Sequence, residues 1–193
     1  MHILVTGAGG MVGRKLVERL AREGAIGGRR IDSATLHDIV PPPVPEAVPF
    51  AVDARAGDIS GEGAAAALFE PRPDVVFHLA AIVSGEAEIE TDKGYRINLD
   101  GMRAMLEAAR AAGNAPRFVF TSSIAVFGAP FPDPIPDDFH LTPLTSYGAQ
   151  KACGELLLAD FTRKGFVDGV GIRLPTVSVR PGKPNKAASG FFS

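Results

Sequence analysis

The stretch Thr6-Gly7-Ala8-Gly9-Gly10-Met11-Val12-Gly13 decides the fold of this chain. It follows a short apolar run at residues 2–6 and leads into residues 11–22, where apolar side chains recur at helical spacing. Its glycines allow a tight strand-to-helix turn whose backbone can approach a pyrophosphate closely. Glycine spacing alone also fits a turn with no ligand, but a strand before it and a helix after it favour a dinucleotide cradle.

Strand and helix signals alternate along the rest of the chain. This alternation predicts an α/β fold, with a doubly wound parallel sheet of the Rossmann type and helices on both faces. Residues 127–144 are rich in proline and aspartate, so we expect a loop over the carboxyl ends of the strands, where such folds bind ligands. The expected strands are residues 2–6, 36–40, 48–52, 74–81, 117–122 and 169–174, and the expected helices are residues 11–22, 63–69, 92–112 and 147–164.

The bulk composition excludes several classes of protein. The chain has 193 residues and a formal net charge of −2, which gives no electrostatic case for nucleic acid or an anionic membrane as a partner. One cysteine, Cys153, excludes an internal disulfide framework and fits a reducing compartment. No secretion signal or membrane-spanning apolar run is present, so we expect a cytoplasmic protein. No metal is expected, because the histidines and Cys153 show no ligand spacing.

A second motif, YGAQK at residues 147–151, follows a pair of serines at the end of a predicted strand. Tyr147 and Lys151 are four residues apart on a predicted helix and therefore share a face. An ammonium beside a phenol favours the phenolate and lowers the pKa of the tyrosine, so Tyr147 can act as a general base toward an alcohol. Ser123 is our choice for binding the reacting hydroxyl, with Ser122 as the alternative and Thr121 as a structural residue. The spacing alone would more often mark a surface pair, but the cradle and the serines favour catalysis.

Asp38, at the end of the second predicted strand, decides the expected cofactor. Its carboxylate can accept hydrogen bonds from ribose hydroxyls and would repel a 2′-phosphate, which favours NAD over NADP. Arg14, just behind the glycines, is the residue that would argue for NADP. Asp58 and Ile59 are expected beside the adenine, the carboxylate on the exocyclic amine and the isoleucine on the ring face. An ordinary solvated turn remains the alternative for Asp38 and for this pair.

Five motifs together resemble those of the extended short-chain dehydrogenase/reductase family, also called the NAD-dependent epimerase/dehydratase family. They are GAGGMVG at 7–13, HLAA at 78–81, Asn98 in RINLDG, TSSIAVFG at 121–128 and YGAQK at 147–151. The resemblance covers essentially the whole chain. It implies catalysis by Ser123, Tyr147 and Lys151. It implies cofactor contacts at Gly7, Gly10, Met11, Val12, Gly13, Asp38, Asp58, Ile59, Leu79, Ala80, Asn98, Tyr147, Lys151 and Pro175.

The resemblance also implies a division of the chain. Family members carry a smaller C-terminal domain that completes the substrate pocket. We therefore expect an NAD-binding Rossmann domain at residues 1–180, the start of a truncated substrate-binding region at 181–193, and the rest of that domain to be missing. A homodimer is expected through the helices near 92–112 and 147–164. The first of them has an apolar set that is broad for one side of a sheet, namely Ile97, Leu99, Met102, Met105 and Leu106.

Two departures from the nucleotide-sugar epimerases bear on the substrate. Phe127 stands where they have tyrosine, and the stretch 173–181 lacks the asparagine that often meets a nucleotide diphosphate. The stretches HLAAIVSGEAE at 78–88 and 172–193 instead resemble members that oxidise C2 of a four-carbon sugar acid to a 2-keto acid. A small carboxylate needs cations, and three follow the last predicted strand: Arg180, Lys183 and Lys186.

We therefore expect an NAD-dependent oxidoreductase that oxidises a secondary hydroxyl of a small sugar acid. A nucleotide-sugar 4-epimerase or dehydratase is the alternative among enzymes, and it differs in regenerating its cofactor in each cycle. A non-catalytic dinucleotide-sensing protein is the alternative of another class. The expected substrate-binding residues are Ser84, Ser123, Tyr147, Thr176 and Arg180.

Overall fold

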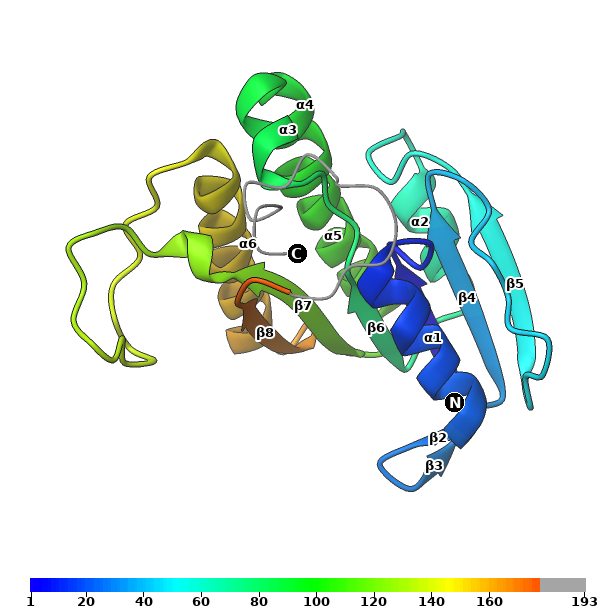
Figure 1. Ribbon diagram of the computed structural model, residues 1–193. Coiled ribbons are helices and arrows are strands. Elements are labelled where there is room, and N and C mark those ends of the chain that lie inside the picture. Colours follow the sequence, from blue (N-terminus) through cyan, green and yellow to red (C-terminus); the bar gives the residue numbers. More distant parts are fainter. Residues whose placement is uncertain (178–193) are drawn as a thin grey trace.

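The computed structural model describes residues 1–177, and within them a six-stranded sheet forms the centre of the molecule (Figure 1). The strand order is β5-β4-β1-β6-β7-β8, and every neighbouring pair is parallel. This order turns back at β1, so the carboxyl ends of β1 and β6 open a crevice where ligands bind in such sheets. The predicted doubly wound parallel sheet is confirmed. Its strands are β1 (His2–Thr6), β4 (Ser33–Asp38), β5 (Ala51–Ala56), β6 (Val75–His78), β7 (Arg117–Ser123) and β8 (Asp168–Leu174).

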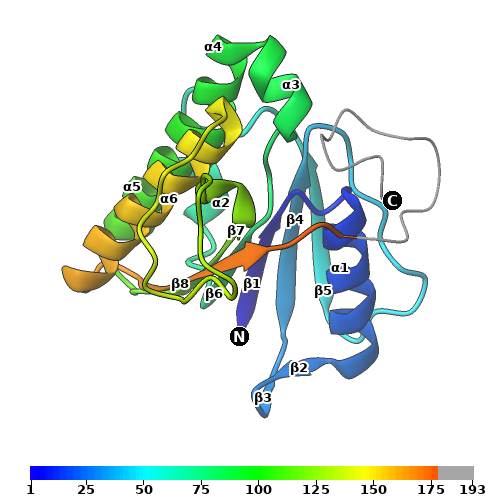
Figure 2. The ribbon, with the colours of Figure 1, turned by 60° about the vertical axis from the view of Figure 1, so that its left-hand side comes forward.

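Helices cover both faces of the sheet, as Figure 2 shows from the side. One face carries α1 (Met11–Glu23), and the other carries α2 (Ala64–Phe69), α5 (Gly101–Ala112) and α6 (Ser146–Arg163). Alternate residues of a strand point to opposite faces, and both faces of β1 are buried. Leu4 accordingly belongs to the core under α5, while its neighbours on either side belong to the core under α1. This explains why the middle of β1, Ile3 to Val5, is an unbroken apolar run.

The long helix expected at residues 92–112 is divided into three parts. It consists of α4 (Thr91–Gly94), a π-helical segment η1 (Tyr95–Asp100) and α5. The sequence does not reveal the π segment, because π-helices are rare and occur mostly as single turns inside α-helices. Four further elements were not predicted: the hairpin strands β2 (Ala25–Ile26) and β3 (Arg29–Arg30), helix α3 (Ser84–Ile89) and the 3₁₀ turn η2 (Ile124–Val126).

Three strands differ from the prediction by more than one residue at an end. β4 begins at Ser33 rather than at 36, and its start was missed because Ser33 and Thr35 are polar. In the structure both hydroxyls lie within hydrogen-bond distance of the ring of His2. β5 spans 51–56 rather than 48–52. It is an edge strand with an exposed Asp53–Arg55 ion pair, so it lacks an apolar run. β6 ends at 78, and the chain continues from there as an irregular segment toward α3.

His78 illustrates how completely the middle of the sheet is buried. It is 1% exposed, its Nδ1 lies 2.9 Å from Thr6 Oγ1 on the paired strand, and its ring stacks on Phe120. Burial lowers the pKa of His78 to about 3, with the nearby Lys151 ammonium as the smaller cause, so the ring is neutral at physiological pH. His78 is therefore part of the core. Within residues 1–177 no group of His, Cys, Asp and Glu side chains could hold a metal ion, and none of the helices there could span a bilayer.

Candidate active site

The glycine cradle joins β1 to α1. Gly7 has φ +75°, and a Cβ there would lie 2.7 Å from the backbone nitrogen of Ala80. A Cβ at Gly13 would lie 2.1 Å from the carbonyl oxygen of Gly7, so only glycine allows the helix to begin this close to the strand. No described side chain caps the first turn of α1, and that turn holds no acidic residue. Its N–H groups and the positive end of the helix dipole are thus available to a phosphate. The residues present fit a dinucleotide.

Asp38 lies beside this cradle, as the sequence predicts. Its Oδ2 accepts a hydrogen bond from Gly9 N at 2.8 Å, and its Oδ1 accepts one from Ile39 N at 2.7 Å. These bonds hold the carboxylate at the end of β4, next to the turn that approaches the pyrophosphate. Arg14 is exposed on α1, where its side chain forms no hydrogen bond or ion pair in the described part of the chain.

Tyr147 and Lys151 lie on one face of α6, at its amino end. Thr145 caps this end by accepting a hydrogen bond from Gly148 N at 3.1 Å, and helix α3 supports it through a bond from Ser146 N to Glu88 at 2.9 Å. The Lys151 ammonium lies 5.6 Å from the centre of the Tyr147 ring. The four-residue spacing therefore brings phenol and ammonium together.

Lys151 is 2% exposed, which is unusual for a lysine. Its Nζ donates to Thr121 O at 2.8 Å and lies 4.7 Å from the centre of the Phe120 ring. Burial lowers the pKa of Lys151 to about 8, so a modest rise in pH above neutrality removes its charge. An ammonium has three N–H donors, so a bond to one carbonyl leaves capacity for ribose hydroxyls.

The two serines at the end of β7 have different surroundings. Ser122 is 2% exposed and donates to Glu155, whose carboxylate also forms a two-point ion pair with Arg173. Ser123 accepts a hydrogen bond from Ala125 N at 3.1 Å, which caps η2, and its own O–H remains a donor. The structure thus favours Ser123 over Ser122 for binding a substrate oxygen. Thr121 donates to the carbonyl of His78, in keeping with its expected structural place.

One pocket of about 570 Å³ unites the cradle with the catalytic candidates. Its size suits a cofactor or a small molecule. Lys151 is the only charged residue among its described lining residues. The predicted site residues that line it are Gly7, Gly10, Met11, Val12, Gly13, Leu79, Ser84, Ser123, Tyr147, Lys151, Pro175 and Thr176. Arg180, predicted to bind substrate, lies outside the described residues, as do the predicted domain boundary at 180 and Lys183 and Lys186.

Four predicted cofactor residues besides Asp38 lie away from the surface of this pocket. Ile59 is 5% exposed and packs in the core beside Gly101, and its contact with the adenine stays a prediction. Asp58 accepts hydrogen bonds from Ser60 and from Arg96 at 2.7 Å, and these bonds lower its pKa to about 2. Ala80 packs against the core, and its backbone meets the cradle at Gly7.

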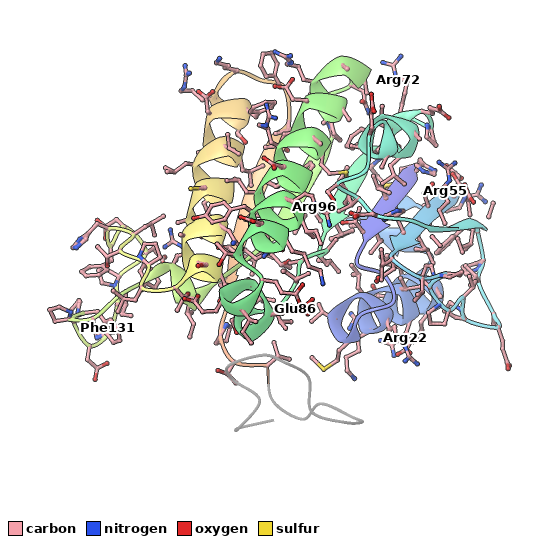
Figure 3. All side chains as sticks on the ribbon, turned by 90° about the horizontal axis from the view of Figure 1, so that it is seen from above. Arg22, Arg55, Arg72, Glu86, Arg96 and Phe131 are labelled. Carbon is pink, nitrogen blue, oxygen red and sulfur yellow. The ribbon has the colours of Figure 1, made fainter. Side chains whose placement is uncertain are left out.

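Asn98 is the fourth of these residues, and its predicted cofactor contact stays a prediction. It is 2% exposed, and its amide is bonded to Ile82 and Gln150. It therefore lies behind the wall of the pocket. Seen from above in Figure 3, η1 and α5 run beside α6, with Arg96 on the side turned away from α6 and Phe131 on the loop beyond it.

Sequence reasoning missed most of the apolar wall of the pocket. Ile82 and Val83 lie in the irregular segment after β6, while Ile124 and Phe131 come from η2 and the loop after it. Thr145 also lines the pocket, and it alone had a readable signal, because a threonine just before an apolar helical pattern is a common N-cap. Ile82, Val83 and Ile124 lie within the quoted motifs and Phe131 within the expected loop, but no local pattern marks their side chains as pocket lining.

A tyrosine-lysine pair with a strand-end serine, opening on a dinucleotide cradle, places this chain in the class of dinucleotide-binding Rossmann domains. The model of the NAD dependent epimerase/dehydratase family matches residues 3–193, and the chain belongs to that family. The family resemblance seen in the sequence is thus confirmed, and NAD is the cofactor that this cradle serves.

Individual relatives are similar over the whole chain. D-erythronate dehydrogenase of Cupriavidus necator is 47% identical and that of Haemophilus influenzae 42% identical, each over 100% of this chain and 60% of its own length. A crystal structure described as the nucleoside-diphosphate-sugar epimerase from Agrobacterium tumefaciens matches with a TM-score of 0.95 and 63% identity. That match covers 100% of this chain and 57% of the other. The chain thus spans about 60% of the length of these curated relatives.

Proposed function

We propose that this chain is the NAD-binding and catalytic part of a dehydrogenase that oxidises a secondary hydroxyl of a small sugar acid, at C2 of a substrate like D-erythronate, to a 2-keto acid. The observation that carries the proposal is the single pocket that joins the cradle to Ser123, Tyr147 and Lys151. Two relatives named D-erythronate dehydrogenase support the choice of substrate. Such an enzyme would act in carbohydrate metabolism, and a cytoplasmic location stays a prediction.

The chain's own residues would share the work of the reaction. NAD, when bound, accepts the hydride that leaves the alcohol carbon. Ser123 holds the reacting oxygen by donating its O–H, and Tyr147 takes the hydroxyl proton as a general base. Lys151 holds the ribose hydroxyls and favours the phenolate by its charge. Since Lys151 is the only charge on the described pocket lining, we propose that Arg180 supplies the cation for the substrate carboxylate, and that Ser84 and Thr176 bind its other oxygens.

A nucleotide-sugar epimerase is the second candidate function. The Agrobacterium structure, which is described as an epimerase, and a 34% identical UDP-glucose 4-epimerase of Azospirillum brasilense favour it. The two functions differ in the fate of the cofactor, because an epimerase returns it unchanged after each cycle.

The test is a screen of the whole protein with NAD against four-carbon sugar acids and UDP-sugars. Net formation of NADH with a sugar acid is the expected result. Interconversion of UDP-sugars without net NADH would replace the proposal with the epimerase. Binding of NAD with neither activity would favour a dinucleotide-sensing protein.

NAD should bind more tightly than NADP, by roughly tenfold or more, because a like charge beside the 2′-phosphate is costly. Titration of both cofactors by calorimetry tests this expectation. Asp38→Asn keeps the shape of the side chain and should narrow the difference, while Arg14→Ala should leave it unchanged. Equal or tighter binding of NADP to the unmodified protein would contradict the role of Asp38.

We also propose a homodimer that associates through α5 and α6. Most of the apolar side chains on which the sequence argument rested cannot contact a partner, because Met102, Met105 and Leu106 are 0% exposed in the core. Leu156, 66% exposed on α6, is an apolar side chain that such an interface would cover. Sedimentation of the whole protein at micromolar concentration should give a dimer, which Leu156→Glu should weaken. A monomer for the unmodified protein would refute the proposal.

A further inference from the structure

A buried glutamine connects the catalytic helix to the wall of the pocket. Gln150 is 0% exposed on α6, one position before Lys151, and its Oε1 accepts a hydrogen bond from Asn98 Nδ2 at 2.8 Å. Asn98 holds the backbone of Ile82 at two points: its Oδ1 accepts from Ile82 N at 2.9 Å, and its Nδ2 donates to Ile82 O at 3.2 Å. Ile82 lines the pocket. The chain of bonds therefore runs from the catalytic helix to the pocket wall.

The donors and acceptors in this chain of bonds fix the orientation of both amides. A backbone N–H can only donate, so the Asn98 atom that faces Ile82 N is the oxygen, and its amino group faces Ile82 O and Gln150. The Gln150 atom that receives the amino group is then an oxygen as well. Rotation of either amide would set donor against donor, so only one arrangement satisfies all the contacts.

The other end of the Gln150 amide lies against Gly94. A Cβ at Gly94 would come within 2.6 Å of Nε2, so the backbone of α4 packs directly on the amide. Nε2 is a buried donor with no hydrogen-bond partner in the described part of the chain. Such a donor costs stability, and an apolar side chain of equal length would avoid the cost. The amide is thus better explained by its contact with Asn98 than by stability.

The segment that Asn98 holds lacks the support of regular structure. Ile82 lies between β6 and α3, outside any strand or helix. Two hydrogen bonds to Asn98 hold its backbone in place of the strand-to-strand hydrogen bonds of a sheet. Asn98 lies in the π segment η1, and single π turns occur often at functional sites. The same segment continues through Val83 to Ser84, which also line the pocket.

We propose that Gln150 is a positioning residue, which acts through Asn98 to hold the pocket wall at residues 81–84 at a fixed separation from Tyr147 and Lys151. The inference rests on the proposed function, because the step that it serves is transfer of the substrate hydroxyl proton to Tyr147. Small misplacements of reacting groups lower rates strongly. Gln150 itself touches neither substrate nor cofactor.

The first test replaces Gln150 by methionine in the whole protein. Gln150→Met keeps length and burial but removes the acceptor, so hydrogen exchange at the Ile82 amide should be roughly tenfold faster. With a sugar acid as substrate, kcat should fall about tenfold while the Kd for NAD changes less than about twofold, because the cradle and Asp38 are untouched. Cys153→Ala, at an exposed position on the same helix, is the control and should change none of these quantities.

Two further variants separate positioning from general damage to the fold. Gly94→Ala improves helix propensity yet forces the amide of Gln150 aside, so it should reproduce both effects without altering the chemistry of Gln150. When Asn98 is already replaced by alanine, adding Gln150→Met should lower kcat by a further factor of less than about two. Gln150 is proposed to act through Asn98, so its effect should disappear when Asn98 is absent.

The possible outcomes are distinguishable. Unchanged exchange at Ile82 in Gln150→Met, or a full tenfold additional loss of kcat in the Asn98→Ala background, would overturn the proposal. Absence of any sugar-acid turnover in the unmodified protein would instead refute the proposed function. The exchange of the Ile82 amide in Gln150→Met and Gly94→Ala would still decide the role of Gln150.

Discussion

Replacement of Tyr147 by phenylalanine is expected to lower kcat by about a hundredfold to ten-thousandfold, the usual contribution of a general base. The change deletes one oxygen from a half-buried side chain, so the fold and the affinity for NAD should be nearly unchanged. Steady-state kinetics across pH, with NAD binding measured in parallel, checks the expectation. The other tyrosine of the chain offers a matched control: Tyr95→Phe removes a phenol that is 41% exposed on η1 and should keep the full rate.

The pH profile makes this experiment decisive. If Tyr147→Phe retained most of the wild-type rate at every pH, another residue would have to be the base, and the assignment of the site would be wrong. A loss of NAD affinity as large as the loss of rate would show that the phenol serves binding rather than proton transfer.

Replacement of Lys151 by methionine is expected to affect both binding and rate. The ammonium is proposed to hold the ribose and to favour the phenolate, so its loss should weaken NAD binding by on the order of tenfold and lower kcat by about a hundredfold. Methionine fills the space beside Phe120, and unfolding followed by circular dichroism monitors the fold. Lys164→Met, at the exposed end of the same helix, should be without effect.

The pKa of Lys151 gives a second readout of the same role. Burial lowers this pKa to about 8, so the free protein loses the ammonium as pH rises through that value. A ribose that is held by the charged form should therefore bind more weakly at higher pH. The Kd for NAD should rise above pH 8 in the unmodified protein and stay level in Lys151→Met. A Kd for NAD that does not change with pH in either protein would show that the ammonium does not contribute to cofactor binding.

The sequence by itself determined the parts of this protein whose geometry is local. A strand, a glycine turn and a helix fix the cradle, because the clash that any Cβ would make at Gly13 arises within a few residues. A spacing of four residues places Tyr147 and Lys151 on one face of any helix. Alternation of strands and helices determined the parallel sheet, since both faces of its strands must be covered.

Tertiary structure alone decided which neighbouring polar residues serve the site. Adjacent strand residues point to opposite faces, so the sequence allows either serine at the end of β7 to bind the substrate. Only the structure shows that Ser122 already donates to Glu155, which is paired with Arg173. In the same way, Asn98 and Gln150 meet across 52 positions of chain. Contacts at such separation depend on how whole elements pack, and no local period or motif of the sequence contains that information.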